Sequence, residues 1–172
     1  MNNFKELDTG RLLVRQFDKT DQEAFIRFMT EPLITSNLAF DDSLKSEEGA
    51  VAILNQTVES YNSERPLLAF VVTEKISGAF MGACGINFLE PNKAEVFYAF
   101  FPEYWGNGFA TEVLSKLKDH LVKDHVVKEI HAFITQHNIA SMKVAEKCGF
   151  RKRGLVTKEG FSSEVFDYVL TM

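Results

Sequence analysis

The segment from Tyr104 to Thr111, with the sequence YWGNGFAT, has the composition of a loop that binds an anion through its main chain. The first amides of a helix have no intrahelical partner and carry the positive end of the helix dipole, and glycine lets the backbone approach a phosphate closely. The segment therefore predicts a phosphate-binding loop, although two glycines before a helix also occur in ordinary turns. It lacks the GK[ST] ending of a Walker loop and the complete G-x-G-x-x-G of a dinucleotide fold.

A second polar segment, from Asn138 to Ser141, opens an expected helix directly after an expected strand. Asparagine is a preferred N-cap, because its side-chain oxygen accepts a hydrogen bond from an amide of the first turn. The hydroxyl of Ser141 stands in that turn, where it can donate to a ligand or bond back to the helix. The residue types allow both a structural cap and a ligand contact.

Histidine and cysteine do not form the patterns of a metal or nucleophile site. The histidines are scattered and never form H-E-x-x-H or another compact set, so no metal is expected; they are His120, His125, His131 and His137. No G-x-S-x-G elbow of a serine hydrolase occurs. Cys84 and Cys148 are too few and too far apart for a disulfide framework, and we expect reduced thiols that line the core or the site.

Periodicity indicates the elements that must position these segments. β-branched and aromatic runs predict strands at residues 11–16, 67–73, 82–89, 95–101, 129–134, 150–155 and 164–170. Helical spacing predicts helices at residues 21–30, 47–62, 110–123 and 138–148. Three of the strands follow one another through short turns, as in an antiparallel meander. The order of the elements predicts a mixed α/β or α+β sheet in one domain, residues 1–172.

Local signals refine some of these boundaries. Thr20 and Glu23 match a capping box at the start of the first helix. The stretch from Pro32 to Ser46 is polar and interrupted by proline, and we expect a loop there. Gly149 is expected to end the last helix in a left-handed conformation.

The composition is that of an ordinary globular domain. The chain has 172 residues, a net charge of −5, a pI near 5.4 and 45% apolar residues. The acidic balance is unfavourable for a protein that coats nucleic acid. Apolar runs stay far below the ~20 residues that span a bilayer, and the N-terminus lacks a secretory signal, so we expect no membrane partner and a cytoplasmic location.

Three passages together resemble the GNAT superfamily of N-acetyltransferases, in the branch typified by the ribosomal-protein N-terminal acetyltransferases RimJ and RimL. They are TGRLLVRQFDKTDQEAF (9–25), AEVFYAFFPEYWGNGFATEVL (94–114) and NIASMKVAEKCGFRKRG (138–154). The resemblance implies a mixed, mostly antiparallel sheet of six to seven strands flanked by about four helices. It also implies that the fourth and fifth strands splay apart and that the pantetheine of acetyl-CoA lies between them. The co-substrate would then be acetyl-CoA, with no metal.

The resemblance also assigns cofactor contacts. The family's pyrophosphate loop, [RQ]-x-x-G-x-[GA], matches Trp105 to Ala110, with Trp105 where Arg or Gln is usual. Asn138 matches an Asn that bonds to the pantetheine arm. On this basis, and from the charge of two lysines, the expected cofactor-binding residues are Phe100, Phe101, Trp105, Gly106, Asn107, Gly108, Phe109, Ala110, Thr111, Asn138, Ser141, Lys143 and Lys147.

Two catalytic roles follow from the same resemblance. Ser141 matches a polar position that can protonate the departing thiolate, whereas the tyrosine that many relatives use is Ala145 here. Glu95 opens a strand beside the expected cleft and is the candidate base, although a surface carboxylate at a strand end is also consistent. Phe97 stands where this branch more often has glycine and narrows the acceptor side. We expect direct transfer to the amine in a ternary complex.

The acceptor and the oligomeric state stay open in the sequence. The acceptor is either a protein N-terminus or a small amine, and its specificity is expected in the first helices, the loop from Leu33 to Lys45 and the last strand pair. A non-catalytic acyl-CoA-binding regulator of the same fold is the alternative function, and both monomer and homodimer are possible.

Charge is distributed unevenly along the chain. Residues 138–160 have a net charge of +4, and Lys143 or Lys147 is expected to meet the 3′-phosphate of CoA. Residues 1–62 carry 11 acidic and 6 basic side chains, which weakly favours a cationic amine.

Overall fold

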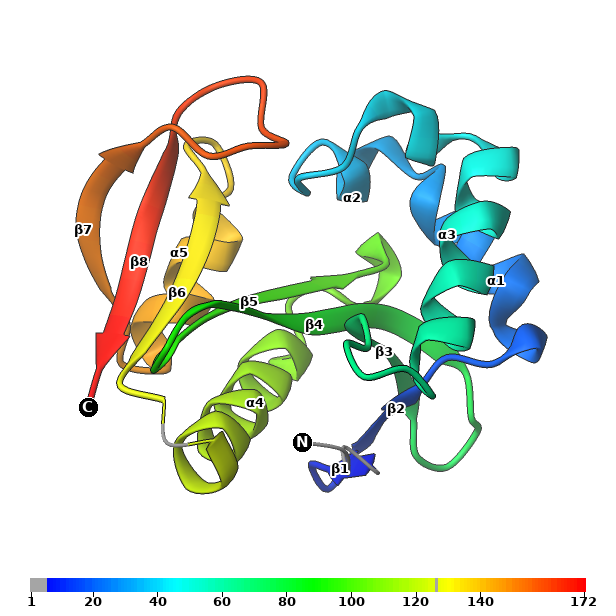
Figure 1. Cartoon of the computed structure of the whole chain (residues 1–172), viewed down its shortest axis with the longest axis horizontal. Coiled ribbons are helices and arrows are strands. Elements are labelled where there is room, and N and C mark those ends of the chain that lie inside the picture. The colour runs from blue at the N-terminus through cyan, green and yellow to red at the C-terminus, as the bar shows by residue number, and fades with distance from the viewer. Residues whose placement is uncertain (1–5, 126) are drawn as a thin grey trace.

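The computed structural model of the chain describes residues 6–125 and 127–172 (Figure 1). In this part of the chain, eight strands form one sheet in the order β1-β2-β3-β4-β5-β6-β8-β7. Their bounds are β1 Glu6–Asp8, β2 Leu12–Gln16, β3 Leu68–Glu74, β4 Phe80–Glu90, β5 Lys93–Phe100, β6 Glu129–Thr135, β7 Arg151–Val156 and β8 Val165–Thr171. Neighbouring strands are antiparallel except β5 and β6. The mixed, mostly antiparallel sheet is thereby confirmed, with one strand more than predicted.

Helices cover both faces of this sheet (Figure 1). The α-helices are α1 Gln22–Met29, α2 Pro32–Thr35, α3 Glu47–Ser60, α4 Phe109–His125 and α5 Ile139–Lys147, and the 3-10 helices are η1 Lys19–Asp21, η2 Asp42–Lys45 and η3 Pro102–Tyr104. Apolar side chains of α4 and α5 share one core with β2 to β6 and β8. Those of α1 and α3 share a second core with the opposite face of β3 and β4. The sheet is therefore the middle of three layers.

The start of α1 differs from the predicted capping box of Thr20 and Glu23. Asp18 is the residue that caps, because it accepts from the main-chain amide of Thr20 at 2.7 Å, while Asp21 accepts from the amide of Asp18 at 2.9 Å. The Thr20 hydroxyl donates to Asp18 instead of capping a helix. Asp18 precedes a 3-10 turn, η1, which shifts the box two residues toward the N-terminus.

Three short elements lie outside the predictions from periodicity. The stretch predicted as a loop contains α2 and η2, each of four residues. Strand β1 has three residues of mostly exposed side chains and pairs only with β2. Elements of this length do not build a repeating apolar pattern, so the residue spacing does not reveal them. The predicted end of the last helix is confirmed, because Gly149 has φ +92°.

The two parallel strands in the middle of the sheet separate after a short contact. The pairing between β5 and β6 runs only from Lys93–Glu129 to Glu95–His131. Beyond it, β5 stays paired with β4 as far as Phe100, and β6 stays paired with β8 as far as Thr135. The sheet therefore opens along the remaining length of these strands, as the resemblance implied.

Candidate active site

A cavity of about 330 Å³ lies where β5 and β6 separate. Its walls include both strands, the first turns of α4 and α5, and the α2 segment from the opposite helical layer. The cavity therefore connects the two faces of the sheet. One end meets the glycine loop predicted to bind phosphate, and the other lies under α2.

The edge of β5 that faces the gap carries free main-chain groups. The amide of Phe101 donates to Met81 O of β4 at 3.0 Å. Alternate residues of an antiparallel ladder direct their amide and carbonyl to the same neighbour, so Tyr98 and Phe100 direct theirs away from β4 and into the gap. The indole nitrogen of Trp105 donates to Phe100 O at 2.8 Å. The amide of Phe100 and the main chain of Tyr98 are left to meet a ligand.

Phe101 itself is turned away from the cavity. Its carbonyl accepts from the amide of Tyr104 at 3.0 Å, so both of its main-chain groups are already used. Its ring is buried against Phe28, with ring centroids 5.7 Å apart, and lies under the guanidinium of Arg27. Phe101 therefore does not line the cavity, contrary to the expectation, whereas Tyr98 of the same strand does.

The glycine loop has the backbone shape that its sequence predicts. Gly106 and Gly108 have φ +78° and +80°, a region that L side chains rarely adopt, and α4 begins at the next residue. A Cβ on Gly106 would meet no atom within 4 Å, so glycine is needed there for its conformation and not for lack of space. The side-chain amide of Asn107 donates to Tyr104 O and Trp105 O at 3.2 and 3.0 Å. Asn107 thus holds the loop in shape and does not line the cavity.

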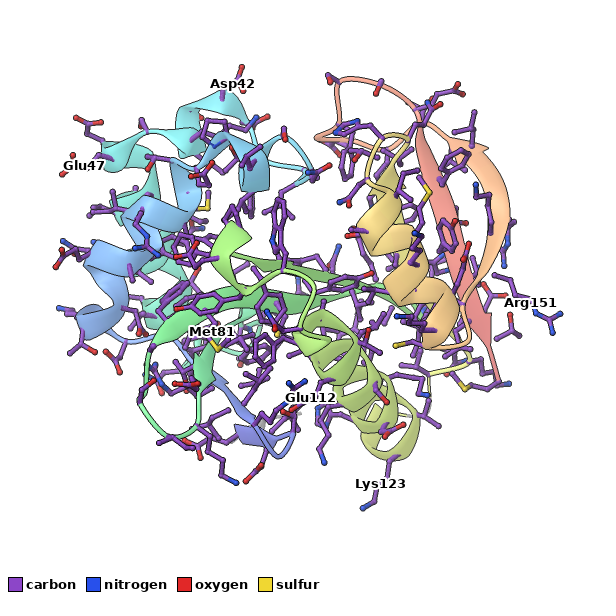
Figure 2. All side chains as sticks on the ribbon, turned by 180° about the vertical axis from the view of Figure 1, so that it is seen from behind. Asp42, Glu47, Met81, Glu112, Lys123 and Arg151 are labelled. Atoms are coloured by element: carbon purple, nitrogen blue, oxygen red, sulfur yellow. The ribbon has the colours of Figure 1, made fainter. Side chains whose placement is uncertain are left out.

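Arg11, which sequence reasoning missed, braces this loop from the N-terminal strands. Its Nε donates to Glu112 Oε2 at 2.8 Å, and its NH2 group donates to Asn107 O at 3.1 Å. Its guanidinium also lies 4.4 Å from the centroid of the Phe109 ring. Glu112 reaches from the first turn of α4 toward the N-terminal strands (Figure 2) and accepts a further bond from Thr9. The brace joins segments about a hundred residues apart, so no local pattern reveals it.

Glu112 is held as a carboxylate by this brace. Its partial burial raises the pKa, but the hydrogen bonds from Thr9 and Arg11 together outweigh burial, and the net effect lowers the pKa of Glu112 below its ordinary value. The negative charge of Glu112 and the positive charge of Arg11 are therefore paired beside the glycine loop at neutral pH.

Asn138 and Ser141 meet at the start of α5, beside the cavity. Asn138 Oδ1 accepts from the amide of Ser141 at 3.1 Å, which is the predicted N-cap. No bond to the Nδ2 of Asn138 is found among the described residues, so this donor is available to a ligand. Ser141 lines the cavity, and its carbonyl accepts from the Tyr98 hydroxyl at 3.1 Å. Burial raises the pKa of Tyr98, so its phenol stays protonated.

A second depression, of about 490 Å³, lies on the outer side of the glycine loop. It is lined by Gly108 and Thr111 of the loop, by Lys116 of α4 and by Lys147 of α5. Lys147 also lines the cavity between the strands, and so does Lys143. Glu112 and Asp119 also line this depression, so its positive and negative charges are balanced there, whereas Lys143 and Lys147 are the charged residues, among those described, that line the cavity between the strands.

Glu95 lies outside the cavity, on the face of the sheet opposite α4. Its carboxylate is paired with Lys158 of the β7–β8 connection at 2.8 Å, and Asn87 lies 3.5 Å away. Phe97, two residues further along β5, does line the cavity. The candidate base thus lies on the same face of β5 as Phe97 but does not itself line the cavity.

The remaining predicted residues lie together around the cavity. All of the expected cofactor-binding residues line the cavity except Phe101 and Asn107. Three residues in or beside the site were not predicted from the sequence: Tyr98, Arg11 and Asn37. Tyr98 could have been found, because it lies in the same strand as Phe100 and two residues before it, on the same edge.

Neither cysteine has the environment of a nucleophile. Burial raises the pKa of both Cys84 and Cys148. Neither lines the cavity, and the Sγ of Cys148 lies 3.6 Å from Thr111 O. Within residues 6–125 and 127–172, no group of three or more His, Cys, Asp or Glu is arranged to hold a metal ion. In the same part of the chain, no helix has the length and apolar character needed to cross a membrane.

Sequence comparison finds a family model that covers most of the chain. The model described as an acetyltransferase (GNAT) domain matches residues 11–151. A similar curated protein is the uncharacterized N-acetyltransferase YoaA of Bacillus subtilis (strain 168), which is 28% identical over 155 residues, covering 89% of this chain and 86% of YoaA.

Solved structures of acetyltransferases share the fold over nearly the whole chain. The Microcin C7 self immunity acetyltransferase MccE, in complex with acetyl-CoA and AMP, has a TM-score of 0.82 and 16% identity over 99% of this chain and 98% of that one. A putative ribosomal-protein-serine acetyltransferase from Vibrio cholerae has a TM-score of 0.81 and 18% identity over 100% of both chains. Spermidine N-acetyltransferase from Vibrio cholerae, in complex with CoA and spermine, has a TM-score of 0.75 and 20% identity over 94% and 95%.

Proposed function

Because this chain belongs to the GNAT acetyltransferase family, we propose that it transfers the acetyl group of acetyl-CoA to a primary amine, directly and within a ternary complex. The observation that carries the proposal is the cavity at the strand separation, which joins the glycine loop on one side of the sheet to the α2 segment on the other. Such a passage lets a thioester and an amine approach each other from opposite faces.

The residues present fit the co-substrate. The loop amides at the start of a 17-residue helix suit the pyrophosphate, and the space beside Gly106 is open. The free main-chain groups of Tyr98 and Phe100 and the Nδ2 of Asn138 suit the amide-bearing pantetheine arm. Lys143 and Lys147 suit the 3′-phosphate.

Acetyl transfer has four chemical requirements. The amine must lose a proton, its nitrogen must reach the thioester carbon, the carbonyl oxygen must be stabilised as it gains charge, and the thiolate must be protonated as the C–S bond breaks. A free amide of β5 is our candidate for the oxygen. Ser141 is the candidate that protonates the thiolate, and Glu95, acting through water, is the candidate that takes the amine proton.

A covalent acetyl-enzyme on cysteine would need a reactive thiol, and the raised pKa of Cys84 and Cys148 is unfavourable for one. Incubation with radiolabelled acetyl-CoA without an amine should leave the protein unlabelled after denaturation. Stoichiometric label on either cysteine would contradict direct transfer.

The function is tested by measuring release of free thiol from acetyl-CoA over a panel of amines and N-terminal peptides. Acceptor-dependent release supports the transferase. Tight binding of acetyl-CoA by calorimetry, together with no release above the acceptor-free rate across the panel, would favour the alternative of a non-catalytic acyl-CoA-binding regulator.

A further inference from the structure

The acceptor half of the cavity is apolar. Its walls on this side include Leu33 and Leu38 of the α2 region, Phe97 of β5 and Phe133 of β6. Asn37 is the polar side chain among them, and its amide is already used: Oδ1 accepts from Thr135 at 2.6 Å and Nδ2 donates to Leu33 O at 3.3 Å. The walls therefore offer an acceptor mainly apolar contact, and one bond at each polar atom of Asn37 is already directed to the protein.

Carboxylates are absent from these walls. Among the described residues that line the cavity, none is Asp or Glu, whereas Lys143 and Lys147 line its other end. Glu95 lies outside and is neutralised by Lys158 at 2.8 Å. None of the acidic residues of the range 1–62 lines the cavity, which counts against the weak preference for a cationic amine drawn from the sequence. A second ammonium group would be desolvated here without a partner, which is costly.

Two contacts close the acceptor side against the C-terminal half of the chain. Thr135 at the end of β6 is bonded to Asn37, and Gly160 of the β7–β8 connection packs against Ala39 so closely that a Cβ on it would lie 2.9 Å from that residue. Figure 1 shows the β7–β8 connection reaching toward the α2 segment. The cavity is therefore roofed by residues 33–39, which limits the size of what can enter.

From the apolar walls, the missing carboxylates and the roof, we infer that the acceptor is a small monoamine whose amino group is attached to an uncharged, apolar body. The inference rests on the proposed transferase function and narrows its substrate class. Apolar surroundings also favour the neutral form of an amine whose pKa in water is about 10, so the cavity itself helps to supply the nucleophile.

The inference is tested by thiol release with three probes: 2-phenylethylamine, 1,4-diaminobutane and a serine-initiated hexapeptide. We expect kcat/KM for 2-phenylethylamine to exceed that for each of the others by about tenfold or more. A higher kcat/KM for the diamine or the peptide would overturn the inference and leave the transferase function standing. Release with none of the three, while the panel of amines and peptides contains another acceptor, would overturn the inference alone, whereas no release across the whole panel would overturn the transferase function and the inference with it.

A matched pair of variants separates the cavity from the rest of the surface. Leu33 is 56% exposed and lines the cavity, and Ile76 is 98% exposed in the β3–β4 turn. Leu33→Glu should lower kcat/KM for 2-phenylethylamine and raise it for 1,4-diaminobutane, because it adds the missing carboxylate, whereas Ile76→Glu should change neither. An unchanged ratio between the two amines in Leu33→Glu would contradict an acceptor site at these walls.

Discussion

Ser141, our proposed acid for the leaving thiolate, lines the cavity, and its main chain is held on both sides. Its amide donates to the Asn138 cap, and its carbonyl accepts from Tyr98. Because the main chain is fixed, the Cβ of Ser141 keeps its place beside the cavity, and the hydroxyl can turn toward a ligand by rotation about χ1.

Ser141→Ala should therefore lower kcat by about 100-fold and leave the affinity for acetyl-CoA unchanged, as expected for loss of a general acid. Release of free thiol measures kcat, and calorimetry measures the affinity for acetyl-CoA. Ser63→Ala, an exposed position, is the control. If Ser141→Ala keeps wild-type kcat and Tyr98→Phe loses it, the protonated phenol of Tyr98 is the acid and our assignment is wrong.

The pair of Glu112 and Arg11 makes the brace of the glycine loop sensitive to acid. The pKa of Glu112 is lowered in the folded protein, so its contribution to stability is complete above the ordinary value of 4.5 and is lost as the pH falls through the folded value. Glu112→Gln should cost about 1 kcal/mol at pH 7. The difference in Tm between wild type and variant should shrink as the pH falls below 4.5. A difference that does not change with pH would mean that packing, and not charge, makes the brace.

At the scale of elements, α5 begins with Asn138, which caps the helix and also lines the cavity. Asn138→Ala should lower the free energy of unfolding by about 1 kcal/mol, because the cap of α5 is lost. Asn138→Asp keeps the capping oxygen but removes Nδ2. It should therefore keep wild-type stability in denaturant titration and bind acetyl-CoA more weakly. Equal affinity in Asn138→Asp and wild type would restrict Asn138 to its structural role.

The pairing of β4 with β5 depends on a glycine opposite an aromatic ring. Gly85 is in register with Phe97, and a Cβ on Gly85 would lie 2.2 Å from Phe97 Cε1 and 2.7 Å from Leu68 O. This explains how a large ring is accommodated where the related branch more often has glycine: the small residue stands on the neighbouring strand.

Gly85→Ala should destabilise the fold by about 1–3 kcal/mol, as overpacking does. The double variant Gly85→Ala with Phe97→Ala should lose less free energy of unfolding than the sum of the losses in the two single variants, because the ring that the added Cβ would meet is then absent. Additive free energies of unfolding would show that the carbonyl of Leu68, and not the ring, is the obstacle.

At the scale of the whole molecule, charge is divided between an acidic N-terminal part and a basic stretch on and after α5. Lys143 and Lys147 belong to that stretch and line the cavity that meets the glycine loop. A polyanionic co-substrate would be attracted to this end of the cavity and would be repelled by the acidic remainder.

The double variant Lys143→Glu with Lys147→Glu should lower the affinity for CoA by about tenfold more than the affinity for dephospho-CoA, because only CoA has the 3′-phosphate that we expect these lysines to bind. The double variant Lys19→Glu with Lys123→Glu changes the net charge equally, and Lys123 lies at the far end of α4 (Figure 2). Isothermal titration calorimetry at two salt concentrations measures the affinity of both double variants for CoA and for dephospho-CoA. Equal weakening of the two ligands would refute the assignment.

The sequence alone determined the glycine loop, the cap at Asn138 and the positions of the long helices and strands. These features depend on neighbours in the chain: φ freedom at Gly106 and Gly108, hydrogen bonding within one helical turn, and apolar repeats of 2 or 3.6 residues. The resemblance added the mostly antiparallel pairing of the sheet and the separation of two of its strands. Short elements such as β1 and α2 carry too few residues for a repeat and were not predicted.

Only the tertiary structure decided what surrounds the acceptor and which side of β5 each residue serves. The hydrogen bond of Asn37 with Thr135 and the brace of Arg11 on the loop join residues 98 and 96 positions apart, and no spacing rule relates such positions. Phe101 follows Phe100 directly, yet it bonds to β4 while Phe100 faces the gap, because successive residues of a strand face opposite neighbours. The acidic excess of the first 62 residues is a property of the chain, whereas the apolar lining of the cavity depends on which side chains the fold brings together.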